Sequence, residues 1–201
     1  MTQRCEVITW QRFYALARRL AHRVNESGYR PDLIVAIARG GYMPARILSD
    51  FLGQPDMDSF RIEHHRNAQK QAAALVRYPL AADIAGRRVL LVDDVSDSGE
   101  TFAAALDHLH TRGAPAQLKT AVLHHKVVSR YAPDYYACKV IKWRWIVYPR
   151  AVAEDLRGFI AAMQPRPPDA EEVSRRLAAD HGIRVAQSLL QEVMDMGDCL
   201  G

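Results

Sequence analysis

The chain has 201 residues, a formal net charge of +4, 49% hydrophobic residues and 25% charged residues. The length suits one domain with a small appendage, and the composition is that of a soluble globular protein. No apolar run approaches the roughly 20 residues that span a bilayer, and the first residues lack the apolar core of a signal peptide. The positive charge suits anionic substrates, whereas no long basic run or aromatic-interleaved basic patch supports nucleic-acid binding.

The cysteines give no sign of a cross-linked or metal-bound framework. Cys5, Cys138 and Cys199 are far apart in the sequence, and no C-x-x-C spacing occurs. An odd number of scattered cysteines predicts a reduced, cytoplasmic setting without disulfides or a zinc site.

Strands and helices alternate along most of the chain. The predicted elements are a helix over 10–24, a strand over 33–37, a helix over 44–51, strands near 57–62, 75–80 and 89–92, a helix from 102 to about 112, and strands over 118–125 and 145–148. Such alternation predicts an α/β domain with a parallel, doubly wound sheet and helices on both faces. The polar stretch 63–73 has no clean period and predicts a mobile loop.

The last part of the chain has a different pattern. Residues 164–169, QPRPPD, are Pro-rich and predict a linker between a domain over 1–163 and a helical tail over 170–201. Apolar positions predict two short helices in the tail, separated by His181 and Gly182. This pattern favours a docking or dimerisation hairpin, with a DNA-reading hairpin as the alternative.

The most informative stretch is RVLLVDDVSDSGETF, residues 88–102. A short apolar run, 89–92, predicts a buried strand, and the carboxylates of Asp93 and Asp94 follow it. An anion at this point would meet the backbone N–H groups of a helix start, where the helix dipole favours negative charge. The small polar residues of the connecting loop are Ser96, Asp97, Ser98, Gly99, Glu100 and Thr101.

This combination of an acidic pair and a D-S-G loop resembles the signature of type I phosphoribosyltransferases. The resemblance implies that fold, with a small hood and here a helical appendage at the C-terminus. It implies that Asp93 and Asp94 hold the ribose hydroxyls of phosphoribosyl pyrophosphate or a Mg²⁺ ion. The 5′-phosphate would bind to the loop made by Ser96, Ser98, Gly99, Glu100 and Thr101. The alternative is a strand–turn–helix of a dinucleotide fold with two solvated acids.

A second candidate anion site is Ala38-Arg39-Gly40-Gly41, directly after the strand 33–37. Two glycines let the backbone approach a ligand closely, and Arg39 adds a fixed positive charge. In the family this position is the pyrophosphate loop, with a strained peptide before the first glycine. The alternative is a plain turn with a solvated arginine.

Two further positions would read the acceptor base. In purine-specific members of the family, a lysine at the place of Lys126 donates to the oxygen at position 6 of the purine, which selects 6-oxopurines over adenine. Trp145 would stack on the purine, with backbone groups of Ile146 and Val147 reading its edge. The alternatives are a solvated lysine and a core tryptophan.

The segments P-D-Y-Y-A and W-I-V-Y-P resemble compact archaeal-type and bacterial purine phosphoribosyltransferases, and the resemblance covers about residues 8–159. In those proteins W-I-V-F-P is commonly followed by W-E. Here Arg150 and Ala151 follow, so the acid is missing and Glu154 or Asp155 is left to substitute for it. The family also implies that the loop 63–73 closes over the site and excludes water.

Together these features predict transfer of a phosphoribosyl group to hypoxanthine, guanine or xanthine, with Mg²⁺ bound alongside phosphoribosyl pyrophosphate. Asp97 is the candidate general base for the purine N7 proton. A homo-oligomer, first of all a dimer, is expected, without nucleic acid or membrane as partner. Two alternatives stay open: a regulator of the same fold that senses phosphoribosyl pyrophosphate or purines, and a transferase for a non-purine acceptor.

Overall fold

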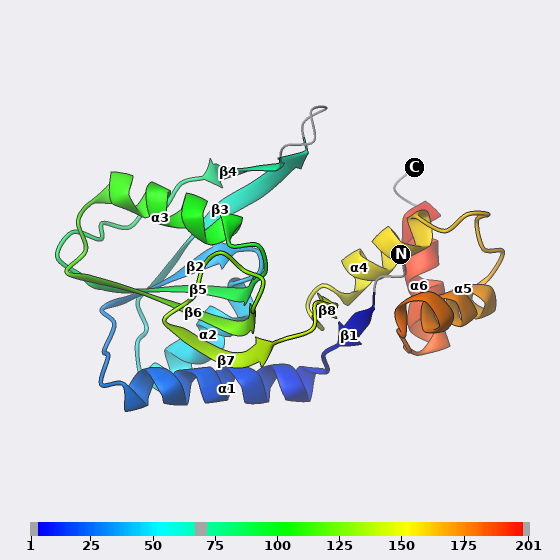
Figure 1. Cartoon of the computed structure of the whole chain (residues 1–201), viewed down its shortest axis with the longest axis horizontal. Coiled ribbons are helices and arrows are strands. Elements are labelled where there is room, and N and C mark those ends of the chain that lie inside the picture. Colours follow the sequence, from blue (N-terminus) through cyan, green and yellow to red (C-terminus); the bar gives the residue numbers. More distant parts are fainter. Residues whose placement is uncertain (1–3, 67–71, 199–201) are drawn as a thin grey trace. The chain divides into compact units, whose positions relative to one another are not determined.

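The computed structural model describes residues 4–66 and 72–198 of the chain, which is shown in Figure 1. Contacts divide the chain into two compact units. The sheet unit is Tyr14–Trp143, and the terminal unit combines Met1–Phe13 with Arg144–Gly201. The predicted boundaries around 164–169 are not the ones along which these contacts divide the chain.

A six-stranded sheet in the order β4-β3-β2-β5-β6-β7 forms the centre of the sheet unit. Its strands are β2 (Leu33–Ala38), β3 (Met57–Arg66), β4 (Ala72–Tyr78), β5 (Arg88–Ser96), β6 (Gln117–Lys126) and β7 (Tyr135–Val140). All neighbouring strands are parallel except β3 and β4, which are antiparallel. The predicted α/β architecture with a mostly parallel sheet is therefore confirmed.

Helices cover both faces of this sheet, with α3 (Glu100–Arg112) on one face and α1 (Trp10–Glu26) and α2 (Tyr42–Leu52) on the other (Figure 1). Because side chains alternate along a strand, every second residue of β2 and β5 points toward α3. Val35 and Leu91 accordingly share a buried cluster with Phe102 and Leu109 of α3. This core fixes the carboxyl ends of β2 and β5, where the predicted site lies.

The prediction of a mobile loop over 63–73 was wrong at both of its ends, where the structure has strands. β3 continues to Arg66, and β4 begins at Ala72, with Glu63 paired to Leu75 in an antiparallel register. Backbone hydrogen bonding between the two strands extends this hairpin, and the hydrophobic pattern of the sequence did not mark it. Residues 67–71, and with them the predicted closure over the site, lie outside the described residues.

Three elements were not predicted from the sequence: β7, the short strand β1 (Cys5–Val7) and the helix α4 (Val152–Ala161). In the terminal unit, β1 pairs in parallel with β8 (Trp145–Val147) in a separate two-stranded sheet. The prediction that the strand around 145–148 joins the main sheet was therefore wrong. The partner that decides its place, β1, is too short for a hydrophobic period to reveal.

The predicted helical tail is present as α5 (Ala170–Arg176), a π-helical turn η1 (Leu177–His181) and α6 (Gln187–Asp198). Gly182 follows η1, as predicted, and the Asp169 side chain accepts a hydrogen bond from the Glu172 N–H at the start of α5. The tail shares one buried cluster with β8 and α4. Its fully or nearly buried members are Val147, Leu156, Met163, Ala170, Val173, Leu177, Ile183, Leu190 and Val193. Among the described residues, no helix combines the length and the apolar character needed to cross a bilayer.

Candidate active site

The acidic pair lies within β5 and not after it. Asp93 and Asp94 are buried, with 7% and 5% of their surface exposed. The backbone N–H of Asp94 donates to Oδ1 of Asp93 over 2.8 Å. The strand continues to Ser96 because β6 runs alongside it, with Asp93 opposite Val122. The two carboxylates are therefore held by a paired strand, which gives them a fixed position at this edge of the sheet.

The Arg39–Gly41 segment packs directly against these carboxylates. A Cβ atom added to Gly40 would lie 2.5 Å from Oδ1 of Asp93 and 2.9 Å from Oδ1 of Asp94. Only glycine fits there without displacing an acid. The peptide bond between Ala38 and Arg39 is cis, and Arg39 is exposed. The structure thus brings the predicted pyrophosphate loop against the predicted ribose-binding acids, which are about fifty residues away in the sequence.

The D-S-G loop leads into the amino-terminal turn of α3. Gly99 precedes the helix with φ of +93°, and an added Cβ would lie 2.7 Å from the backbone nitrogen of Tyr131. Glu100 and Thr101 form the first turn of α3, so the helix begins two residues before the predicted start at Phe102. The first N–H groups of a helix lack intrahelical acceptors and favour an anion. One of these N–H groups, that of Glu100, lies 3.3 Å from Oγ of Ser98, and the binding of a phosphate to this loop stays a prediction.

A neighbouring segment that the sequence did not single out supports this loop. Ser96 is 1% exposed, and its Oγ lies 2.8 Å from Oγ of Ser129 and 3.1 Å from the carbonyl oxygen of Tyr131. The Tyr131 ring stacks on Phe102 of α3 at a centroid distance of 4.8 Å. The described contacts of the Ser96 hydroxyl are thus within the protein, and its predicted contact with a phosphate stays a prediction. No motif marks Ser129 or Tyr131, so only the fold reveals them.

Asp97 and Lys126, predicted to act on different atoms of a base, form an ion pair. Nζ of Lys126, at the end of β6, lies 2.7 Å from Oδ2 of Asp97. The Lys126 side chain is 3% exposed and that of Asp97 is 39% exposed. Trp143 completes the cluster: its Nε1–H donates to Oδ1 of Asp97 over 3.2 Å, and its ring centroid is 4.5 Å from Nζ of Lys126.

His125 precedes Lys126 in β6. Burial, and then the positive charge of Lys139, lowers the pKa of the His125 imidazole. The His125 and Tyr136 rings are in contact, with a centroid distance of 5.5 Å.

The residues predicted to contact the base through β8 belong to the terminal unit. Trp145 is 38% exposed, and its Nε1–H donates to Oδ1 of Asp155 over 3.1 Å. Ile146 is nearly buried and Val147 is buried, and the Val147 carbonyl accepts a hydrogen bond from the Ile8 N–H. Asp155 thus takes a place beside the tryptophan, although the sequence lacks the usual acid after Arg150. Stacking of Trp145 on a purine stays a prediction.

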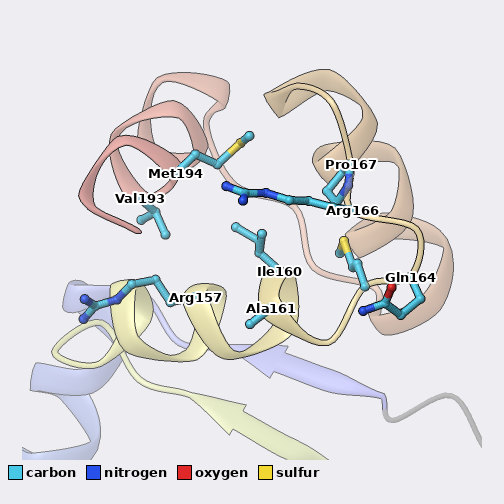
Figure 2. Close-up of a pocket in the computed structure, with 9 residues that line it drawn as sticks. Arg157, Ile160, Ala161, Gln164, Arg166, Pro167, Val193 and Met194 are labelled. Atoms are coloured by element: carbon cyan, nitrogen blue, oxygen red, sulfur yellow. The ribbon is translucent and has the colours of Figure 1, made fainter. Parts of the chain in front are cut away.

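The terminal unit also contains a pocket of about 400 Å³ between α4, the segment after it and α6 (Figure 2). Its lining residues are Arg157, Ile160, Ala161, Met163, Gln164, Arg166, Pro167, Val193 and Met194. None of them is among the residues predicted to bind phosphoribosyl pyrophosphate or a base. The residues that line the pocket are therefore different from those of the predicted active site.

Comparison with known proteins assigns the chain to a family. The model of the phosphoribosyl transferase domain matches residues 5–155, which is more than half of the chain. The chain belongs to the phosphoribosyltransferase family. The helical tail over 170–201 lies outside the matched region.

Relatives with named activities are similar over most of their length. The chain is 29% identical to a xanthine-guanine phosphoribosyltransferase of Cereibacter sphaeroides over 148 residues, covering 71% of this chain and 84% of that protein. It is 27% identical to a hypoxanthine-guanine phosphoribosyltransferase of Saccharomyces cerevisiae, covering 72% and 84%. The crystal structure of a purine phosphoribosyltransferase from Pyrococcus horikoshii matches with a TM-score of 0.65 and 30% identity, covering 75% of this chain and 94% of that chain.

Proposed function

We propose that this protein transfers the 5-phosphoribosyl group from phosphoribosyl pyrophosphate to N9 of a 6-oxopurine and releases pyrophosphate. The observation that carries the proposal is the ion pair between Asp97, which directly follows β5, and the buried Lys126 at the end of the neighbouring strand β6. Asp97 is three residues after Asp94 in the sequence. This arrangement supplies groups for a ribose and for a base at one sheet edge, where α/β proteins bind ligands. The relatives described above are named xanthine-guanine and hypoxanthine-guanine phosphoribosyltransferases, and these names support the same reaction.

The groups proposed for phosphoribosyl pyrophosphate surround the carboxyl ends of β2 and β5. Asp93 and Asp94 accept hydrogen bonds from the ribose hydroxyls. The N–H groups at the start of α3, with Ser98, bind the 5′-phosphate. The Arg39 guanidinium and the backbone around Gly40 bind the pyrophosphate, so that negative charge is stabilised as the bond to C1′ breaks.

The acidic pair also has the donor chemistry for Mg²⁺. Among the described residues no group of three or more histidine, cysteine or acidic side chains forms a metal cluster. Mg²⁺ commonly uses only one or two carboxylates and completes its shell with water and substrate phosphates, so Asp93 and Asp94 fit this ion. When bound, Mg²⁺ supplies positive charge to the leaving pyrophosphate.

The groups proposed for the base act on two different atoms. As N9 forms its bond to C1′, the proton on N7 passes to the carboxylate of Asp97. Lys126 donates a hydrogen bond to the oxygen at position 6. The contacts of Trp145, Ile146 and Val147 with the base stay predictions from the sequence, because these residues belong to the terminal unit. The selectivity among hypoxanthine, guanine and xanthine lies at position 2 of the base.

Further parts of the proposal concern assembly and location. We propose a cytoplasmic homodimer that needs neither nucleic acid nor membrane. Cys5 and Cys138 are thiols that form no disulfide, which supports a reducing compartment. Sedimentation of the purified protein measures the oligomeric state, and a monomer at micromolar concentration would contradict the dimer.

The experiment that tests the proposed reaction is a panel of free bases. Hypoxanthine, guanine, xanthine, adenine and orotate are each incubated with phosphoribosyl pyrophosphate and Mg²⁺, and pyrophosphate release is followed. We expect release with at least one 6-oxopurine and little with adenine or orotate. Turnover of orotate alone would indicate a non-purine transferase, and binding of phosphoribosyl pyrophosphate without turnover of any base would indicate a regulator.

The role of Lys126 is tested with Lys126→Met, which keeps the length of the buried side chain. Loss of a charged hydrogen bond costs about 1.5–3 kcal/mol, so we expect roughly a ten- to hundredfold rise in KM for the 6-oxopurine and little change for phosphoribosyl pyrophosphate. Lys119→Met, near the other end of β6, is the matched control, because Lys119 pairs with Asp134. An equal loss for both substrates would show that Lys126 acts elsewhere.

A further inference from the structure

Trp143 contacts both partners of the Asp97–Lys126 pair with different parts of one side chain. It lies between β7 and β8, and 46% of its surface is exposed. Its indole N–H donates to Oδ1 of Asp97 over 3.2 Å, while its ring centroid is 4.5 Å from Nζ of Lys126. Because the tryptophan is half-exposed and makes both contacts, packing alone does not account for its position.

We infer that Trp143 is a positioning residue that sets the preference for 6-oxopurines over 6-aminopurines. This inference rests on the proposed function, since it assigns Trp143 a part in reading position 6 of the base. The indole acts through Lys126, by keeping water from its ammonium group, and through Asp97, by fixing the orientation of its carboxylate.

The effect on Lys126 follows from desolvation. Nζ has three N–H donors, and one of them meets Oδ2 of Asp97. Water would normally satisfy the others, but the side chain is only 3% exposed, and the indole face is close to the ammonium. A purine oxygen would satisfy such a donor, whereas an amino group of adenine would leave two donors facing each other without water. A site whose donors are dry rejects the wrong partner more strongly than a hydrated one.

The effect on Asp97 follows from its two oxygens. Oδ2 accepts from Lys126 and Oδ1 accepts from Trp143, so rotation of the carboxylate would break both hydrogen bonds. Holding a reacting group in one geometry favours proton transfer at a fixed atom. The same indole therefore orients the proposed base and shields the proposed donor.

Trp143 is suited to a clean test because its exposure keeps the folding cost of a substitution small. Trp143→Phe retains an aromatic face over Lys126 and removes the N–H, and Trp143→Ala removes both. Trp10→Ala is the matched control, since Trp10 is 54% exposed and belongs to the other unit. For each variant, kcat and KM are measured with hypoxanthine and with adenine, and adenine is also measured as an inhibitor against hypoxanthine.

We expect Trp143→Ala to lower the ratio of kcat/KM for hypoxanthine to that for adenine by about tenfold, from lost shielding and an unfixed carboxylate. Trp143→Phe should keep most of the preference and lose part of kcat, because it lacks only the hydrogen bond to Asp97. KM for phosphoribosyl pyrophosphate should change less than about twofold in both, since uniform loss would signal general disorder. Where adenine is not turned over, the ratio of its inhibition constant to KM for hypoxanthine gives the same measure.

An unchanged ratio in Trp143→Ala, in an enzyme that uses hypoxanthine as well as wild type does, would overturn this inference and leave the proposed function standing. A proportional loss with both purines and with phosphoribosyl pyrophosphate would also overturn it, because that is the signature of a structural role. Failure of the wild type to use any 6-oxopurine would instead overturn the proposed function, and the inference with it.

Discussion

Nζ of Lys126 lies 2.7 Å from Oδ2 of Asp97, joining the end of β6 to the residue that follows β5. The residue proposed to accept a proton from the base is therefore held by the residue proposed to read that base. A base that binds here must share the donors of Lys126 with Asp97. Substrate reading and proton transfer are thereby linked through one hydrogen bond.

Asp97→Asn is expected to lower kcat by about 10²–10⁴-fold, the usual contribution of a general base. The alternative role, a cap of the following helix, is not what the contacts show, because Asp97 bonds to Lys126 and Trp143 and the residue before α3 is Gly99. Single-turnover rate and melting temperature are measured on the same protein. Asp107→Asn, exposed on α3, is the control. A near-normal rate in a destabilised Asp97→Asn enzyme would remove Asp97 from the mechanism.

The double variant Asp93→Asn with Asp94→Asn is expected to abolish turnover and to keep the fold. Asparagine has nearly the shape of aspartate, so the close approach of Gly40 is preserved, whereas the charge needed to hold a cation or ribose hydroxyls is lost. Circular dichroism checks the fold, and pyrophosphate release measures turnover. Normal activity in the folded double variant would show that the ribose and metal sites lie elsewhere.

Gly40→Ala should raise KM for phosphoribosyl pyrophosphate by at least roughly tenfold, because the new methyl group collides with both carboxylates and one of them must move. The melting temperature should fall as well, since the clash is with buried groups. Gly158→Ala, on α4, is the control: an added Cβ there meets nothing within 4 Å. It should leave KM unchanged and stabilise the helix by up to about 1 kcal/mol. Equal behaviour of the two variants would contradict the close packing of Gly40 against the acidic pair.

The protein should lose a pH-dependent part of its stability in acid through Asp32. The Arg88 guanidinium and backbone N–H donate hydrogen bonds that hold the pKa of Asp32 at about 2, below its ordinary value of 3.8. Because the pKa of Asp32 is lower in the folded than in the unfolded state, the ionised carboxylate stabilises the fold at pH values above the unfolded pKa. This stabilisation is lost as the pH falls from about 4 to about 2. Asp32→Asn should therefore flatten the fall in melting temperature over that range. The same steep fall in Asp32→Asn and in the exposed control Asp83→Asn would contradict the assignment.

Leu190→Ala is expected to destabilise the terminal unit by about 2–5 kcal/mol, because Leu190 is fully buried in the cluster that joins the tail to α4 and β8. Met196→Ala, at a residue of the same helix that is 43% exposed, should change stability by less than about 0.5 kcal/mol. Chemical unfolding measures both. Equal stabilities of the two variants would show that the tail does not depend on this core.

Deletion of the tail from Pro165 onward should change stability or oligomeric state before it changes chemistry, because it uncovers Val147 and Leu156. Light scattering and kinetics on the truncated protein measure these separately. A stable oligomer of unchanged subunit number that has lost activity would show that the tail contributes to the site.

The sequence by itself determined the parts of the fold that have strong local signals. The buried runs 33–37 and 89–92 are continuously apolar, and α1 and α3 have amphipathic periods, so their order already predicts a parallel sheet. The acidic pair and the D-S-G loop lie between the apolar run 89–92 and the helix α3. Their position in the sequence therefore already predicts that they lie at the carboxyl end of a strand in the sheet. Local periodicity does not mark the hairpin of β3 and β4 or the pairing of β1 with β8, because hydrogen bonding to a distant partner sets them.

Only the tertiary structure decided which of these residues meet. Gly40 against the acids, Lys126 against Asp97 and Trp143 over both are contacts between segments that lie tens of residues apart. Trp143 and Trp145 are two residues apart in one sequence stretch, and nothing in their spacing tells that the first donates to Asp97 and the second to Asp155. The reason is physical. Which side chains meet depends on which strands become neighbours and in what register, and the packing of the whole fold sets both, whereas a local sequence pattern does not.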